Sequence, residues 1–254
     1  MNELLLHTNK FMLVLVRTAG VVMVAPMFGA ASVPVMIKAA FALMLSLMLS
    51  PLVAGEAPAL AGVAAYVVVV IRELIVGLAM GFTAMLAFGT FQVAGEFVGR
   101  QMGFAMGEMV DPLYEEQTSI FSTFHHTLAM LLFLAINGHH WFLQALCGSF
   151  RSIPLGGCGL PASVTAGMVQ RFVEVFVGGL KMSAPAVCVL LLVTVGLGLL
   201  ARAAPLLNML MISISVRIAV GLMLVGMLIP YVFQFGRIVL GSMQRDLGLL
   251  IEAL

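Results

Sequence analysis

The side chains of this sequence with the clearest capacity for chemistry are charged residues that interrupt otherwise apolar segments. A charge inside a membrane-type segment costs several kcal/mol unless it is paired or faces a wet cavity. We therefore expect structural or inter-subunit charges, which either line an aqueous path or are buried against protein partners. These residues are Arg17, Arg72, Glu73, Glu96, Arg100, Arg202 and Arg217.

Two pairs among these charges differ in the geometry that a helix imposes on them. Arg72 and Glu73 are adjacent, so on a helix they point about 100° apart and each needs another partner. Glu96 precedes Arg100 by four residues, which is the favoured order for a pair on one helical face. This spacing leaves two interpretations open: a helix that neutralises itself, or an inter-subunit salt bridge near a gate.

Patterns typical of enzymes and metal sites are absent from the sequence. It has no GxSxG, HExxH or Gly-rich phosphate loop and no paired acidic constellation, so we expect no enzyme, no cofactor and no metal site. Four of the five histidines stand in adjacent pairs, His125-His126 and His139-His140, and we expect these pairs at a membrane interface beside Trp141. The cysteines show no CxxC spacing, and we expect buried free thiols at Cys147, Cys158 and Cys188.

Composition indicates the class of protein that must position these charges. The chain has 254 residues, of which 62% are apolar and 9% charged, and its mean hydropathy is +1.16. Soluble domains are about 25% charged, so we expect an all-α, polytopic membrane-type protein. A net charge of +1 gives no argument for nucleic-acid binding. Arg17 interrupts the first apolar run, so we expect no cleaved signal peptide.

Proline residues and polar stretches divide the apolar segments into predicted helices. We expect helix breaks at Pro26, Pro34, Pro112 and Pro205, and a bend at Pro230. The last two short segments, 206–215 and 218–229, are expected to be split by Arg217. Before them we expect helices over residues 11–25, 35–53, 59–87, 88–100, 124–136, 141–150 and 168–200, with an amphipathic tail over 236–254.

Glycines recur along the predicted helices over 59–87 and 88–100 and in the residues that follow. Gly77 and Gly81 are four apart, and a second series continues at Gly95, Gly99, Gly103 and Gly107. Small residues at this spacing let another backbone approach closely in a membrane-type helix. Each glycine also costs about 1 kcal/mol of helix stability against alanine. We therefore predict a close-contact helix that loosens into a flexible segment near its end.

Several stretches together resemble the flagellar biosynthetic protein FliR family. They are VRTAGVVMVAPMFGAASVPVMIK, RELIVGLAMGF, QVAGEFVGRQMGFAMGEMVDP, LLFLAINGHHWFLQAL, FRSIPLG and GLLARAAPLLNMLMISISVRIAVGL. They occur in the family's order over nearly the whole chain. The chain departs from the family pattern at residues 212–216 and at Glu108 and Met109.

The resemblance implies a subunit of the type III protein export gate of the bacterial inner membrane, in the flagellar basal body, concerned with flagellum biogenesis and protein transport. It implies P-type and Q-type partner subunits, the larger export-gate membrane proteins, and unfolded secreted proteins as substrates. Residues 1–160 would be P-subunit-like, with a plug-like loop near 102–122. Residues 161–254 would form a Q-subunit-like hairpin, and part of the multi-pass chain would stand on the periplasmic side.

The segment after the glycine series is the predicted plug of this gate. The resemblance places a closing loop here, with Gly103 and Gly107 permitting bending and Phe104, Met106 and Met109 supplying bulky apolar groups. Apolar constrictions hold back ions by dewetting, and methionine repacks readily. A plain connector is the alternative for this segment.

Three further interpretations of the whole chain stay open. The first is a virulence-type secretion homologue of the same gate. The second is a secondary transporter, which broken helices and charges at depth also suit, although no inverted repeat is visible. The third is a scaffold that nucleates the gate without lining it.

Overall fold

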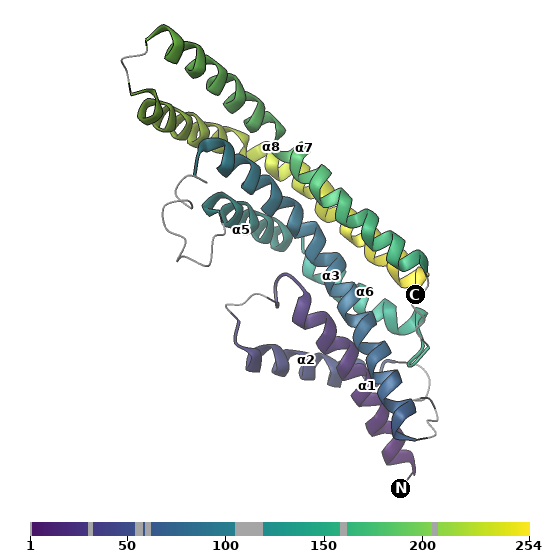
Figure 1. The fold of residues 1–254 in the computed structure, drawn as a ribbon. Coiled ribbons are helices and arrows are strands. Elements are labelled where there is room, and N and C mark those ends of the chain that lie inside the picture. Colours follow the sequence, from purple (N-terminus) through teal and green to yellow (C-terminus); the bar gives the residue numbers. More distant parts are fainter. Residues whose placement is uncertain are drawn as a thin grey trace. The chain divides into compact units, whose positions relative to one another are not determined.

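The computed structural model of the chain describes residues 2–29, 33–53, 58, 62–104, 119–157, 162–204 and 208–254. Every regular element in these ranges is an α-helix (Figure 1). The helices are α1 (Asn2–Val24), α2 (Val35–Leu49), α3 (Val63–Met102), α5 (Ile120–Ala135), α6 (Gly138–Ser152), α7 (Ala162–Ala203) and α8 (Met209–Ala253).

Three of these helices, α3, α7 and α8, are long and apolar enough to cross a membrane. The bent pair α5 and α6 adds a fourth crossing if the pair is counted as one span. Ile136 and Asn137 separate the two helices, and Asn137 has a left-handed backbone with φ of 57°. The chain is therefore an all-α protein of the membrane type, as its composition predicts.

The predicted division of the last helix is wrong. We expected Arg217 to separate two segments, but α8 remains helical through Arg217 and continues past Pro230. The Arg217 Nε donates to the carbonyl oxygen of Ser213 at 3.2 Å, so part of its guanidinium is satisfied by its own helix. Proline is tolerated inside apolar helices of this class, and α7 likewise continues through Pro185.

Contacts divide the chain into two compact units, and unit 1 comprises residues 1–87, 136–172 and 241–254. Its α1 and α3 touch through their backbones. A Cβ added to Gly20 would lie 3.1 Å from the Leu74 carbonyl oxygen, and one added to Gly77 would overlap the Arg17 carbonyl group. A Cβ at Gly81 would lie 2.9 Å from Val24 Cβ. The close approach predicted for this pair of α3 glycines is confirmed.

The unit 1 part of α3 buries one face. Its buried residues recur every three or four positions, as a helix with one covered side requires. The series is Val69, Glu73, Val76, Met80 and Ala84. On the other side of the crossing α2 packs against α1, and the rings of Phe28 and Phe41 stack at 4.4 Å between centroids. Glu73, a charged residue, thus occupies one of the buried positions on this face of α3.

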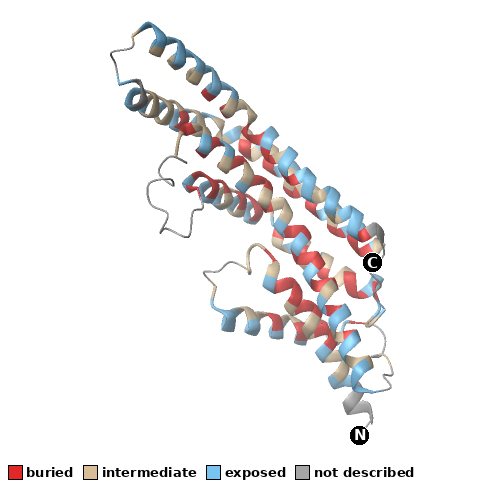
Figure 2. Cartoon of the chain, viewed as in Figure 1, coloured by how far each residue is buried: buried red, intermediate tan, exposed pale blue. Residues whose placement is uncertain are grey.

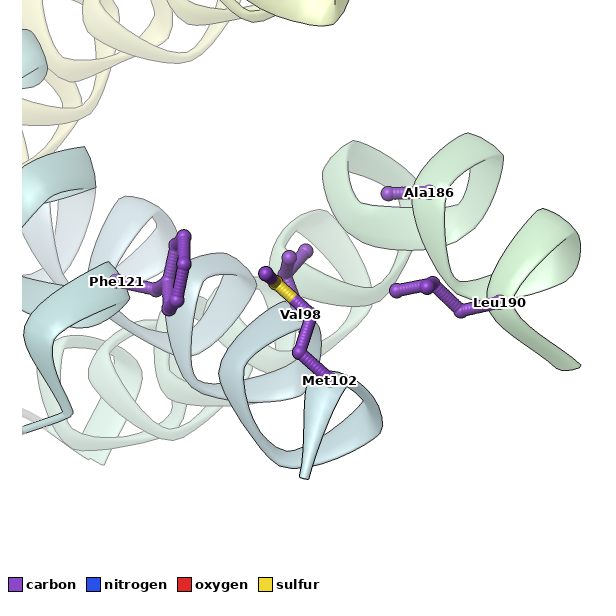
Figure 3. Packing of buried hydrophobic residues seen from close by; sticks show 5 residues of the cluster. All are labelled: Val98, Met102, Phe121, Ala186 and Leu190. Carbon is purple, nitrogen blue, oxygen red and sulfur yellow. The ribbon is translucent and has the colours of Figure 1, made fainter. Parts of the chain in front are cut away.

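Unit 2 comprises residues 88–135 and 173–240. Gly95 of α3 faces the start of α5, because an added Cβ would lie 2.7 Å from Ser122 Cα. Gly178 of α7 faces Thr90 in the same way, at 2.9 Å from its methyl carbon. An apolar cluster of this unit is built by α3, α5 and α7 (Figure 3); it consists of Val98, Met102, Phe121, Ala186 and Leu190.

Much of α7 and α8 is exposed (Figure 2), and many of the exposed residues on both helices are large and apolar. Leu192 is 73% exposed on α7, and Met223 and Met227 are each 67% exposed on α8. Exposed large apolar residues in such number are typical of contact with a membrane or another protein. We therefore expect lipid or another protein to cover the exposed apolar residues of α7 and α8.

Candidate functional site

The main polar site of unit 1 is a buried ion pair between α1 and α3. The Nε of Arg17 donates to Oε2 of Glu73 at 2.6 Å, and both side chains are fully buried. The glycine-mediated crossing of α1 and α3 brings these two positions together. We call this pair and its backbone partners at Ser149, Ile153 and Gly156 the Arg17–Glu73 centre.

Arg17 also binds the end of α6. Its Nη1 donates to the carbonyl oxygen of Ser149 at 3.0 Å, and its Nη1 and Nη2 both lie 3.3 Å from the carbonyl oxygen of Ile153. The last carbonyls of a helix have no partner within the helix, and a cation there is favoured by the helix dipole. The guanidinium carbon also lies 4.5 Å from the centre of the Phe150 ring, within the range of a cation–π contact. Arg17 therefore acts as a C-terminal cap supplied by another helix.

Glu73 and its neighbour Arg72 hold the turn that follows α6. The second carboxylate oxygen of Glu73, Oε1, accepts from the backbone N–H of Gly156 at 2.7 Å. Arg72 Nη1 donates to the carbonyl oxygen of the same glycine at 3.3 Å. Gly156 has a φ of +76°, a conformation that glycine adopts at little cost. The two adjacent charges point in different directions, as predicted, yet both bind one turn.

The Arg17–Glu73 centre has a structural role. A buried cation and a buried anion neutralise each other, and their remaining hydrogen-bonding groups bind the backbone. Of the two alternatives given for these charges, Arg17 and Glu73 fit the structural one, because each is paired within the chain. The centre ties α1, α3 and α6 together at one point, and a buried pair of this kind is costly to break.

The end of α3, in unit 2, is the second candidate site because the predicted plug begins there. Gly103 has a φ of +96°, and the Phe104 N–H donates to the carbonyl oxygen of Gly99 at 3.2 Å. This bonding pattern, with glycine in a left-handed conformation, is a Schellman cap. The Phe104 ring meets the Phe121 ring edge-on at 5.2 Å and packs against the apolar cluster of Figure 3.

The structure therefore assigns a local role to two of the five predicted plug residues. Gly103 ends α3, and Phe104 turns back onto the unit 2 core. Met106, Gly107 and Met109 lie outside the described residues, so their placement stays a prediction. A Cβ added to Gly103 would lie 3.7 Å from Nη2 of Arg217, which puts a cation beside the C-terminus of α3, where the helix dipole favours it.

The other predicted charges lie on helix surfaces, and two of the predicted breaks lie at helix ends. Arg100 Nε and Glu96 Oε1 are 2.6 Å apart, and Arg100 is 68% exposed. Arg202 is exposed near the end of α7. Pro26 follows α1, and Pro34 immediately precedes α2. Pro112 and Pro205 lie outside the described residues.

Histidine and cysteine positions differ in part from expectation. His125 is buried in the protein, with Nδ1 2.8 Å from the Phe121 carbonyl oxygen. Cys188 is exposed and Cys147 half-buried, and both are free thiols; Cys158 lies outside the described residues. The described ranges hold no cluster of three or more residues suited to a metal ion.

Sequence reasoning did not identify the partners of the Arg17–Glu73 centre. Three of them are backbone groups, at Ser149, Ile153 and Gly156, and every residue type carries such groups. It also did not identify the ion pair between Arg171 Nη1 and Asp246 Oδ1, at 2.8 Å. Its two residues are on different helices, and no spacing rule links them.

Comparison with known proteins gives consistent matches over most of the chain. The family described as "Bacterial export proteins, family 1" matches residues 8–242. The flagellar biosynthetic protein FliR of Escherichia coli (strain K12) is 31% identical over 228 residues, which cover 89% of this chain and 87% of that protein. The FliR protein of Bacillus subtilis (strain 168) is 29% identical over 237 residues, covering 92% and 91%. The Caulobacter vibrioides FliR protein is 27% identical over 219 residues, covering 85% and 86%.

Proposed function

The chain belongs to the FliR family of bacterial export proteins, and from this premise we propose that it is a membrane subunit of the flagellar protein export apparatus. The match to flagellar relatives over most of both chains carries this proposal. The exposed apolar surface of α7 and α8 supports a place in the inner membrane, in contact with lipid and other subunits. We propose no enzymatic role for it.

In this role the chain helps to form and close the channel through which unfolded proteins leave the cell. Its partners are P-type and Q-type gate subunits, with the larger export-gate membrane proteins nearby, in the flagellar basal body. Residues 1–160 form the P-like part and residues 161–254 the Q-like hairpin, with Pro154 to Pro161 as the seam. The Arg17–Glu73 centre supports an internally braced P-like part, since it joins α1, α3 and α6.

The closing element of this proposal is the plug that begins at Gly103. Its support is the cap at the end of α3, where Phe104 packs onto Phe121. A capped helix end gives the following loop a fixed origin. Soft apolar side chains beyond it would close the idle channel by dewetting and repack when a substrate chain passes.

A deletion tests the plug. Removing Phe104 to Met109 leaves gate assembly intact but raises small-ion leakage across the inner membrane, measured as membrane conductance in cells with normal complex levels. A matched variant that replaces the same six positions with glycine and serine keeps the loop length and loses only its apolar side chains. It should leak equally. Unchanged conductance in both variants refutes the plug and favours a connector.

Complementation separates the flagellar role from its alternatives. Expressed in a motile bacterium that lacks its own FliR protein, the chain should restore export of flagellar proteins to the medium. Restored secretion only in a virulence-type system would contradict the flagellar assignment. Transport of a small solute by the chain alone, without P-type and Q-type subunits, would favour the transporter.

A further inference from the structure

In unit 2, each of the two long helices α7 and α8 contains a proline, at Pro185 and Pro230. A proline has no N–H, so the carbonyl oxygen four residues earlier in the helix has no backbone donor. In α7 this carbonyl belongs to Lys181, and in α8 it belongs to Gly226. Sharp bends in helices occur mainly at such positions, so each helix resists bending least at its proline.

A tyrosine of α8 replaces the hydrogen bond that α7 lacks. The hydroxyl of Tyr231 donates to the carbonyl oxygen of Lys181 at 3.0 Å, and this is the acceptor that Pro185 leaves without a backbone donor. In apolar helices, groups on neighbouring helices commonly satisfy carbonyls that a proline has freed. Tyr231 directly follows Pro230, so this bond joins the two positions at which the helix pair bends most easily.

A small cavity lies between the two helices at the same level. Its volume is about 20 Å³, and its lining includes Met182 and Ala186 of α7. Ile229 and Val232 of α8 also line it. Protein interiors are close-packed and contain few empty spaces. This space therefore gives the side chains around the two prolines room to shift.

Beyond the prolines, α7 and α8 pack on the end of α3. Ala186 and Leu190 of α7 belong to the same apolar cluster as Met102 of α3 (Figure 3), and Phe104 packs against that cluster. A Cβ added to Gly221 of α8 would lie 2.5 Å from the side chain of Met102, so α8 touches the end of α3 closely. These contacts hold the helix end from which the proposed plug begins.

We propose that Pro185 and Pro230 form a hinge, that the Tyr231 hydroxyl holds this hinge closed, and that bending of the hinge releases the cap at the end of α3. The moving part, which we call the arm, consists of residues 186–203 of α7 and 209–229 of α8. When the tyrosine bond opens, the arm tilts and its contacts with the end of α3 are lost. The hinge thereby regulates the plug, and this last step rests on the proposed function.

Amide hydrogen exchange of the assembled complex tests the hinge. Tyr231→Phe removes the hydroxyl and keeps the ring. Exchange should become about two- to tenfold faster at residues 186–190 and at Phe104, which is the range that the loss of one hydrogen bond predicts. Pro185→Ala restores the N–H that the Lys181 carbonyl lacks, so Tyr231→Phe should have no further effect in a Pro185→Ala background. A role of Tyr231 in packing alone would not depend on Pro185.

Tyr66→Phe is the matched control, because it removes a tyrosine hydroxyl from unit 1 and should leave exchange at residues 186–190 unchanged. Unchanged exchange in Tyr231→Phe overturns the hinge, and so does equal acceleration by Tyr231→Phe with and without Pro185→Ala. If Tyr231→Phe does not assemble, Pro185→Ala alone decides the question. Slower exchange at residues 186–190 than in the wild type is then expected, and unchanged or faster exchange contradicts the hinge.

Spin labels measure whether the arm moves. One label is attached to Cys188, an exposed free thiol on the arm, and the other to Thr123→Cys, an exposed position on α5, in a chain that carries Cys147→Ser and Cys158→Ser. Tyr231→Phe should broaden the distribution of distances between the labels, and an unchanged distribution overturns the movement. Membrane conductance of the same variant should rise. A broadened distribution with unchanged conductance supports the hinge and contradicts the plug, so the two proposals fail separately.

Discussion

Replacing Arg17 with leucine should be among the most destabilising single changes in the P-like part of the chain. The change leaves the Glu73 carboxylate buried without its cation, and the carbonyls of Ser149 and Ile153 lose their donors. Breaking a buried pair by removing one partner costs about 3–5 kcal/mol. A protein of this size loses about 2–4 °C of Tm for each kcal/mol, so the expected fall in Tm is about 6–20 °C.

Arg100 provides a matched control for this change. Its Nε also lies 2.6 Å from a glutamate oxygen, but the side chain is 68% exposed whereas that of Arg17 is fully buried. Exposed pairs four residues apart on a helix contribute about 0.3–0.5 kcal/mol. Arg100→Leu should therefore lower Tm by about 1–2 °C. The two variants differ in burial and in the backbone acceptors that only Arg17 binds.

The assay is thermal unfolding of the purified complex, followed by size-exclusion chromatography of the protein that remains folded after heating. A double variant, Arg17→Leu with Glu73→Leu, sharpens the result. Removing the unpaired carboxylate as well should recover part of the lost Tm, because apolar replacements of a buried pair are often tolerated. Recovery is incomplete, since the Gly156 N–H loses its acceptor. Equal Tm losses for Arg17→Leu and Arg100→Leu would refute the reasoning.

Three other changes test the remaining packing and charge assignments. Gly77→Ala forces a Cβ onto the Arg17 carbonyl group and should lower the free energy of unfolding by about 1–3 kcal/mol. Gly241→Ala meets open space and should raise it by up to about 1 kcal/mol. Both variants are measured by Tm, and an equal fall in Tm for the two would contradict the close contact at Gly77. Phe104→Ala removes an edge-on ring contact and should lower the free energy of unfolding by about 2 kcal/mol. Amide hydrogen exchange at the capped end of α3 should become faster, and unchanged exchange would argue against the cap. Arg202→Ala should lower the yield of intact complex, because it would leave an acidic partner on a neighbouring subunit unpaired, which costs about 3–5 kcal/mol. A normal yield of complex would contradict this pairing.

The sequence predicts the helices and their close contacts well, because both depend on local patterns. Apolar segment length indicates the long helices, and four-residue glycine spacing indicates the contacts at Gly77, Gly81 and Gly95. The wrong division at Arg217 came from reading a charge as a break. An arginine that bonds to a carbonyl of its own helix, here that of Ser213, leaves the helix intact.

The partners at the two candidate sites could not be predicted in the same way. Arg17 is 132 and 136 positions from the carbonyls of Ser149 and Ile153, and a backbone acceptor has no sequence signature. The cap at the end of α3 did carry a signal, since glycine followed by a large apolar residue is typical of a Schellman motif. The same two residues, Gly103 and Phe104, also suit a plug, and the pattern alone does not separate the two roles.

The sequence separation within the Arg17–Glu73 centre has a consequence during synthesis. Glu73 is 56 residues after Arg17, so at about 5–20 residues per second Arg17 has no partner for roughly 3–11 s after it is made. The carbonyl of Ile153 follows 80 residues later, since 136 − 56 = 80, after roughly another 4–16 s. During this interval an unpaired cation in α1 disfavours release into lipid. α1 should therefore reach its buried position only after α3 and the end of α6 have been made, so that this part of the chain packs as a group.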